Sequence, residues 1–336
     1  MATICKRGDF QFQATIRRKG YPCQIKTFET RQEAEAWARA IESKMDSNQF
    51  RDTREVQSTT LGQALQRYLE EVTPTKRGHV NETNRIKLLQ RHPISLRTLA
   101  SLKARDYAEY RNQRLTQVGN NTVRLELAVL SHLYTIAIKE WSLPLDHEPK
   151  NIRKPPAGQG RDRRLVGNEE ARLFAAMEHP QCRSALWLRA SIKLAIETGM
   201  RAGEILGIEW HQVDLERGVI RLHKTKNGSA RVVPLSIKAV QVLQSLPRQT
   251  ERVIPNFHDT SGLDRAFKRV SAAAKISGLH FHDLRHECAT RLAPNMKVQT
   301  LAKIMGWKTL QMAMRYYNPS DDELVRTIRG AQPSSL

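Results

Sequence analysis

The sequence contains few cysteines. Its 336 residues include four, and no two of them form a CxxC pair or lie near a histidine at metal-ligand spacing. Neither a zinc site nor a disulfide framework is therefore expected, and we interpret the cysteines as reduced packing residues. They are Cys5, Cys23, Cys182 and Cys288.

Long apolar runs are also missing. No segment approaches the roughly 20 apolar residues that cross a bilayer, and none has the pattern of a basic amphipathic anchor. Residues 1–7 lack the apolar stretch of a secretory signal. We therefore expect a cytoplasmic protein with no membrane partner.

Acidic residues are outnumbered. The chain has 34 Asp and Glu against 55 Lys and Arg, which gives a formal net charge of +21 and a pI near 10.2. This balance favours a polyanionic partner, with nucleic acid as the leading candidate, and predicts association with the nucleoid. A ribosomal protein, a repressor or a nuclease would carry similar charge, so specific residues must identify the chemistry.

The chain is long enough for two or three domains. Residues 9–28 alternate apolar and polar side chains around a turn at 17–20, which predicts two strands with a basic tip. Thr30 and Glu33 form a capping box for a following helix. We assign residues 1–50 to a small sheet with one helix. The cations of its tip either enter a DNA groove or are simply solvated, and they are Arg17, Arg18 and Lys19.

A helical unit and a linker come next. Residues 58–148 show helical spacing with no strand signal, which predicts a small helical domain. Residues 149–165 contain prolines, glycines and a basic run, and we interpret them as a linker. The linker cations either follow a phosphate backbone or are solvated, and they include Arg153, Lys154, Arg163 and Arg164.

Residues 166–330 are expected to form a third unit, helical apart from one strand pair. Segments 218–222 and 230–235 flank Lys226-Asn227-Gly228, and an Asn-Gly pair between apolar runs indicates a hairpin. The predicted fold is therefore mainly α with small β elements, of the α+β class, with a C-terminal tail at 318–336.

Four stretches carry side chains suited to phosphodiester chemistry. They are residues 198–204 with Arg201, the turn around Lys226, residues 282–285, and the run from Trp307 to Tyr317. Cleaving a phosphodiester without metal needs a nucleophile, cations on the non-bridging oxygens and an acid for the leaving oxygen. Each stretch alone is a weak signal, because such residues are usually structural.

Together and in this order, the four stretches resemble the tyrosine recombinase, or integrase, family over nearly the whole chain. The matching motifs are Thr198-Gly199-Met200-Arg201, Lys226-Asn227-Gly228 ahead of Val233-Pro234-Leu235, His280-Phe281-His282-Asp283-Leu284-Arg285-His286, and Leu301 to Trp307 with Tyr316 nine residues later. Residues 121–127 and 160–165 resemble shufflon-type recombinases of plasmids. The N-terminal sheet and helix resemble the arm-site-binding domain of phage and transposon integrases.

The resemblance implies that Tyr316 is the nucleophile. Arg201 and Arg285 would hold the phosphate, because a planar guanidinium binds phosphate oxygens bidentately and stays charged at working pH. His282 would accept or hydrogen-bond the proton of the phenol, whose ordinary pKa is about 10. Tyr317 is disfavoured, because neighbouring helical residues point about 100° apart and cannot reach one phosphate.

The resemblance also implies supporting roles. Lys226 would be the general acid for the 5′-oxygen; Lys224 competes on the same strand face, but counting back from Val233-Pro234-Leu235 favours Lys226. Trp307 stands where most members have histidine, and its indole N–H donates a hydrogen bond but cannot shuttle a proton. Glu204 is expected to orient neighbouring groups. The histidines flanking the second box are expected to be structural, and they are His280 and His286.

The implied reaction forms a 3′-phosphotyrosyl link and frees a 5′-hydroxyl, which then attacks a partner strand's link. Because bond energy is conserved, no ATP, metal or other cofactor is expected. The implied partners are double-stranded DNA at core and arm sites, three further copies in a tetramer on DNA, and a directionality factor. The tail at 318–336 would dock onto a neighbouring protomer.

Two biological roles remain open. Integration and excision of a phage or mobile element fit the arm-type N-terminus, whereas inversion of a DNA cassette fits the shufflon-like middle. A catalytically silent DNA-binding factor is opposed by the intact set of candidate residues. The arm-type N-terminal domain disfavours a type IB topoisomerase, because DNA relaxation needs no second DNA site.

Overall fold

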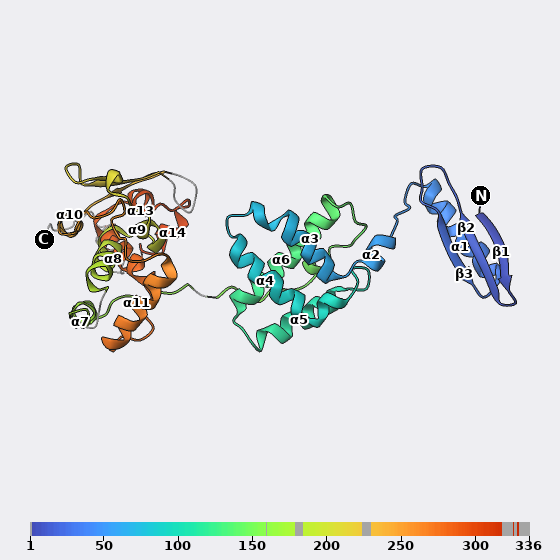
Figure 1. Ribbon diagram of the computed structural model, residues 1–336, viewed down its shortest axis with the longest axis horizontal. Coiled ribbons are helices and arrows are strands. Elements are labelled where there is room, and N and C mark those ends of the chain that lie inside the picture. Colours follow the sequence, from blue (N-terminus) through green and yellow to red (C-terminus); the bar gives the residue numbers. More distant parts are fainter. Residues whose placement is uncertain are drawn as a thin grey trace. The chain divides into compact units, whose positions relative to one another are not determined.

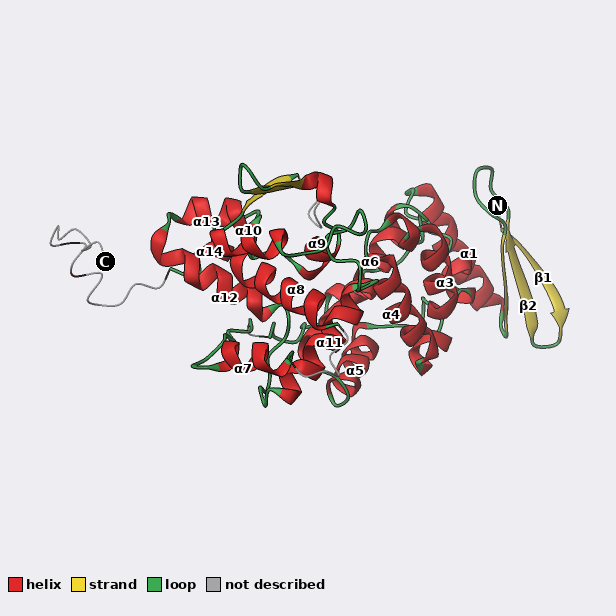
Figure 2. Ribbon diagram, turned by 60° about the vertical axis from the view of Figure 1, so that its left-hand side comes forward, coloured by secondary structure: helices red, strands yellow, loops and turns green. Residues whose placement is uncertain are grey.

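The computed structural model describes residues 2–158, 160–178, 184–223 and 230–317, together with residues 325 and 328. The chain divides into two compact units, Met1–Gln159 and Gly160–Leu336 (Figure 1). Their boundary lies within residues 149–165, the segment interpreted as a linker. Helices dominate both units and the strands are short (Figure 2), so the predicted α+β class is confirmed.

The N-terminal unit begins with an antiparallel sheet of order β1-β2-β3 and one helix. Strand β1 was not predicted, because residues 2–8 are mostly exposed and show no clear apolar alternation. Ile16 packs with Ala38 and Met45 of the helix, so the helix covers one face of the sheet as expected. The elements are β1 (Ala2–Gly8), β2 (Gln11–Ile16), β3 (Gln24–Phe28) and α1 (Arg31–Asp46).

The rest of this unit is helical, as predicted for residues 58–148. Its core is made of apolar side chains and four buried tyrosines, and a buried ion pair joins Arg114 to Glu126 at 2.8 Å. The helices are α2 (Arg54–Ser58), α3 (Leu61–Glu71), α4 (His79–Arg91), α5 (Ala104–Leu115) and α6 (Asn120–Lys139), with short 3-10 turns at Thr73–Thr75, Pro93–Leu96 and Glu148–Lys150.

The C-terminal unit is built around helix α8, which packs against α10, α11 and α12. A second antiparallel sheet, of order β4-β5-β6, pairs Ile220 with Val233 as the predicted hairpin requires. The elements are α7 (Glu169–Ala176), α8 (Ala185–Thr198), α9 (Ala202–Leu206), β4 (Val213–Asp214), β5 (Val219–Leu222), β6 (Arg231–Pro234), α10 (Ile237–Gln244), α11 (Thr260–Ala273), α12 (Asp283–Leu292), α13 (Val298–Met305) and α14 (Gln311–Met314), with a 3-10 turn at Trp210–Gln212 and another at Ala293–Asn295.

Within the described ranges, no helix combines the length and the apolar character that crossing a bilayer requires.

Three helices meet at Gly199, which ends α8 with a φ of +62°. A Cβ there would lie 2.6 Å from Sδ of Met305 at the end of α13, and 3.2 Å from Sγ of Cys288 in α12. Both neighbours are buried. Glycine is therefore required at this position for two reasons: the left-handed backbone conformation, and the close approach of the Met305 and Cys288 side chains.

Gly199→Ala should lower the free energy of unfolding of the C-terminal unit by about 2–4 kcal/mol, because left-handed strain and overpacking add. Gly167→Ala is the matched control, since its φ is +55° and no atom lies within 4 Å of a Cβ there. It should cost only the strain, about 1–2 kcal/mol. Urea denaturation measures both, and equal losses would show that the packing contact at Gly199 is unimportant.

Candidate active site

Arg201 and Glu204 lie at the start of α9, directly after the Gly199 turn. The carboxylate accepts from the Arg201 backbone N–H at 2.9 Å and from its Nη1 at 2.7 Å, which is a capping-box arrangement. Arg231, the first residue of β6, donates from Nη2 to Oε2 of the same carboxylate at 2.7 Å, and this oxygen also accepts from the Arg201 backbone N–H. Glu204 therefore bridges two guanidinium groups, consistent with the orienting role expected of it.

Glu204 is buried, and burial alone would raise the pKa of its carboxyl group. The charge of Arg231 and the hydrogen bond from the Arg201 backbone more than offset this effect and lower the pKa below its ordinary value. The carboxylate is thus ionised at neutral pH and keeps both arginines in place.

Arg285 occupies the third position of α12 and is 4% exposed. Its two terminal nitrogens donate to the backbone carbonyls of Gly199 and Met305. Burial, followed by the charges of Arg201 and Arg231, lowers the pKa of Arg285 to about 9. The group therefore remains a cation at neutral pH, and its five N–H donors are not exhausted by two carbonyls.

Tyr316 lies in the turn that follows α14. Its hydroxyl hydrogen-bonds Nδ1 of His286, and its ring stacks on Trp307 with centroids 5.3 Å apart and planes at 8°. Burial raises the pKa of the Tyr316 phenol despite the opposing charges of Arg315 and Arg285. The phenol is therefore protonated at neutral pH and needs a proton acceptor before it can act as a nucleophile.

His282 and His286 are presented from the first turns of α12, and their rings meet edge to face at 5.4 Å. His282 is exposed, whereas His286 is half-buried against Tyr316. Burial, His282 and Arg315 lower the pKa of His286, so its ring is neutral at pH 7 and Nδ1 can accept the phenolic proton.

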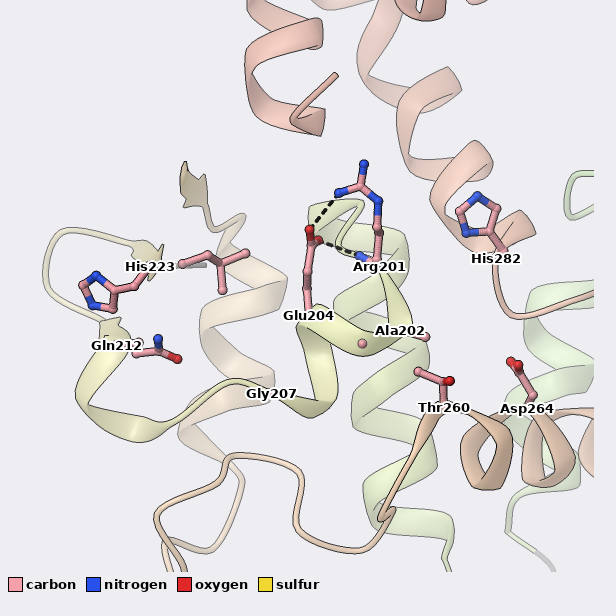
Figure 3. A pocket seen from close by; sticks show the side chains of 11 residues that line it. Arg201, Ala202, Glu204, Gly207, Gln212, His223, Thr260, Asp264 and His282 are labelled. Carbon is pink, nitrogen blue, oxygen red and sulfur yellow. Dashed lines mark hydrogen bonds and ion pairs between the residues drawn. The ribbon is translucent and has the colours of Figure 1, made fainter. Parts of the chain in front are cut away.

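Two adjoining cavities contain these side chains. One of about 390 Å³ is lined by His282, Arg285, His286, Trp307, Thr309, Gln311, Met312, Arg315 and Tyr316. The other, of about 740 Å³, contains Arg201, Glu204 and Asp264 and shares His282 with the first. His282 therefore lines both cavities, and in Figure 3 its ring points to the same side as the Arg201 guanidinium.

Tyr317 points elsewhere. Its hydroxyl donates to the backbone carbonyl of Met296 at 2.6 Å, and it packs in the small cluster of Leu301 and Ala313. Tyr317 lines neither of the two cavities, and Tyr316 stays the predicted nucleophile.

The candidate lysine, Lys226, and its competitor Lys224 lie outside the described residues, as does nearly all of the predicted tail at 318–336. Within the described ranges, no group of three or more His, Cys, Asp or Glu side chains could hold a metal ion.

The basic residues proposed from sequence to contact DNA fall into two groups. Arg17, Arg18 and Lys19 are exposed at the turn between β2 and β3, with Arg18 paired to Asp46 at 2.5 Å. Arg153 and Lys154 are also exposed.

The other linker arginines bind carboxylates of the C-terminal unit. Arg163 pairs with Glu169 at 2.6 Å, and Arg164 pairs with the buried Glu287 at 3.2 Å. Their neighbour Arg161 pairs with Asp283 at 2.9 Å, and Asp283 and Glu287 both belong to the helix that carries Arg285. Arg161 and Arg164 thus bind α12 and Arg163 binds α7, and contact of Arg163 and Arg164 with DNA stays a prediction.

The sequence pattern of the phage integrase family matches residues 163–323. A shufflon-specific DNA recombinase of Escherichia coli is 38% identical over 271 residues, which are 78% of this chain and 69% of that protein. A putative integrase/recombinase of Haemophilus influenzae is 35% identical over 341 residues, 98% of this chain and 91% of the relative.

The chain belongs to the phage integrase family. Its activity is site-specific DNA recombination of the tyrosine recombinase type, as the sequence motifs predicted. The fold agrees: a lambda integrase dimer bound to a COC′ core site aligns with a TM-score of 0.67 at 21% identity, over 99% of this chain and 97% of that one.

Two residues that contact the candidate residues of this recombinase were not predicted from the sequence to do so. His286 was expected to be structural, yet it contacts the Tyr316 hydroxyl. Its position four residues after His282, on the same helical face, was the available signal. Arg231 was not singled out, because its contact with Glu204 joins residues 27 apart in the sequence and only folding brings them together.

If neutral His286 accepts the proton of Tyr316, cleavage by the recombinase should fall as pH drops through the lowered pKa of this histidine. The neutral imidazole that accepts the proton is present above that pKa and lost below it. The acid limb of the pH–rate profile, in which the cleavage rate falls with pH, should therefore lie below the ordinary histidine pKa of about 6.5. His286→Asn keeps an acceptor near Nδ1 but does not titrate, and should lack this limb. Single-turnover cleavage against pH measures it, with the exposed His280→Asn as control. An unchanged limb in His286→Asn would contradict the assignment.

Proposed function

We propose that Tyr316 attacks the scissile phosphate of a duplex core site to give a 3′-phosphotyrosyl link. The phenolic oxygen forms a bond to phosphorus, and the bond from phosphorus to the 5′-oxygen breaks. The phenolic proton passes to His286, with His282 contacting the phosphate beside it. Lys226 gives a proton to the leaving 5′-oxygen. A 5′-hydroxyl from a partner strand later reverses these steps, so the bond energy is conserved.

The single observation that carries this proposal is the convergence of the groups in adjoining cavities. Tyr316, His286, Trp307 and Arg285 line one cavity, and His282 joins it to the cavity of Arg201. Nucleophile, proton acceptor and phosphate-binding cations thus come from three separate segments of the sequence. A chance cluster of structural residues has no reason to combine these three functions.

The two arginines suit the proposed transition state. A pentacoordinate phosphorane carries more negative charge than the diester, and guanidinium groups already fixed by Glu204, Gly199 and Met305 need little reorganisation to meet it. Trp307 would donate its indole N–H to a phosphate oxygen while its ring holds the ring of Tyr316 in place.

The partner in this proposal is double-stranded DNA, bound mainly through phosphate contacts and therefore with a steep dependence on salt. Exposed cations at Arg17, Lys19, Arg153 and Lys154 would contribute to that affinity. Exchange between two duplexes requires four strand cleavages, which one tyrosine per protomer of a homotetramer supplies. Arm-site binding by residues 1–50 and a directionality factor complete the scheme.

We further propose integration and excision of a phage or mobile element as the biological role. The N-terminal sheet supports it, because the fold likeness to lambda integrase extends over 99% of this chain. DNA inversion is the second candidate, supported by the 38% identity to the shufflon-specific recombinase. A plasmid carrying two sites in inverted orientation, compared with two sites on separate molecules, distinguishes these roles.

The proposed nucleophile can be tested with a nicked suicide duplex whose site is selected from a random library by binding to the protein. Wild type should form a covalent adduct that resists denaturation without added metal, and Tyr316→Phe should form none. Tyr317→Phe is the matched control and should retain the adduct, because its hydroxyl contacts only the Met296 carbonyl in the described structure. Tight binding without any adduct would favour the silent DNA-binding factor instead.

A further inference from the structure

Arg231 is a buried arginine with no role in the proposed reaction. Its side chain is 8% exposed, and it is the first residue of β6. Nη2 binds Oε2 of Glu204 at 2.7 Å, while Nη1 donates to the backbone carbonyl of Ile304 in the last turn of α13. It thus touches both the segment that carries Arg201 and the helix that leads to Trp307.

The contact with α13 is tight. Gly306 follows this helix with a φ of +63°, and a Cβ there would lie 2.8 Å from Cδ of Arg231. The arginine therefore packs under the turn that presents Trp307. Because glycine is needed for both the conformation and the approach, this turn and the Arg231 side chain must be placed together.

The contact with Glu204 decides the charge of the site. Arg201 and Arg231 share one carboxylate, so the three groups carry a net charge of +1. Without Arg231, the ion pair of Glu204 and Arg201 would have no net charge. The negative charge of Glu204 would then largely cancel the field of Arg201 at a nearby phosphate. Because burial strengthens such pairing, the loss would be greater here than on the surface.

We propose that Arg231 is a positioning residue for phosphoryl transfer, which shares the Glu204 carboxylate with Arg201 and so leaves the Arg201 guanidinium oriented and positively charged toward the phosphate. This inference rests on the proposed function. Arg231 itself does not contact the DNA; it acts through the carboxylate.

The first test measures the single-turnover rate of adduct formation on the nicked duplex and, separately, the affinity for that duplex. Arg231→Met should slow cleavage by about 100-fold, the order found when one fixed charge donor to a transition state is removed. Affinity should change by less than about 3-fold, because most of it comes from distant phosphate contacts. Arg231→Lys keeps the charge and should lose less.

The decisive comparison adds Glu204→Gln to Arg231→Met. The double variant again has an uncancelled Arg201, so it should cleave at least about 10 times faster than Arg231→Met alone. A purely structural role for Arg231 predicts the opposite, since removing a second buried partner would only add damage. A double variant no faster than the single one would overturn the proposal.

A second readout needs no double variant. A substrate with a methylphosphonate at the scissile position lacks the charge that Arg201 would neutralise. On this substrate the ratio of the wild-type rate to the Arg231→Met rate should be smaller than on the phosphodiester, and the same holds for Arg201→Ala. Misfolding of a variant would instead lower its rate by the same factor on both substrates. If Arg231→Met does not fold, Arg231→Gln, which also removes the charge but keeps a polar N–H donor, carries the same comparison. An unchanged ratio would also overturn the proposal.

The two proposals fail in different ways. If wild type forms no adduct, the proposed nucleophilic function is wrong whatever the variants do. If wild type forms the adduct through Tyr316 and Arg231→Met cleaves as fast, only the role of Arg231 is wrong.

Discussion

A buried excess of positive charge is the constraint around which the catalytic unit is organised. Among the described residues, Glu204 bridges Arg201 and Arg231, and burial together with the charges of these two arginines lowers the pKa of Arg285 to about 9. Like charges held in a poorly solvated site destabilise the free protein. A bound phosphodiester would supply the missing negative charge, so the same arrangement would favour its transition state still more.

The ends of two helices make this concentration of charge tolerable. Gly199 and Gly306 turn the chain at the C-termini of α8 and α13, and their left-handed conformations leave backbone carbonyls facing the arginines. Arg285 binds one carbonyl at each end, and Arg231 binds a further carbonyl of α13. The negative ends of both helix dipoles thereby offset part of the charge.

The sequence predicted local features well and long-range contacts poorly. The pairing of β5 with β6 and the helical domain followed from alternation and periodicity, and motif order placed Arg285 in the same cavity as Tyr316. The partners of Arg231 and Arg164 could not be foreseen, because each joins segments that only tertiary packing brings together. The linker pattern indicated basic residues but not the carboxylates that pair with them.

The central claim is that the charge cluster serves a phosphotyrosyl transfer by Tyr316. The most direct measurement is to digest the trapped protein–DNA adduct and locate the modified residue by tandem mass spectrometry. We expect a nucleotide 3′-phosphate on Tyr316 in the peptide that follows α14, with Tyr317 unmodified. Attachment to Tyr317 or to a residue outside the two cavities would contradict it.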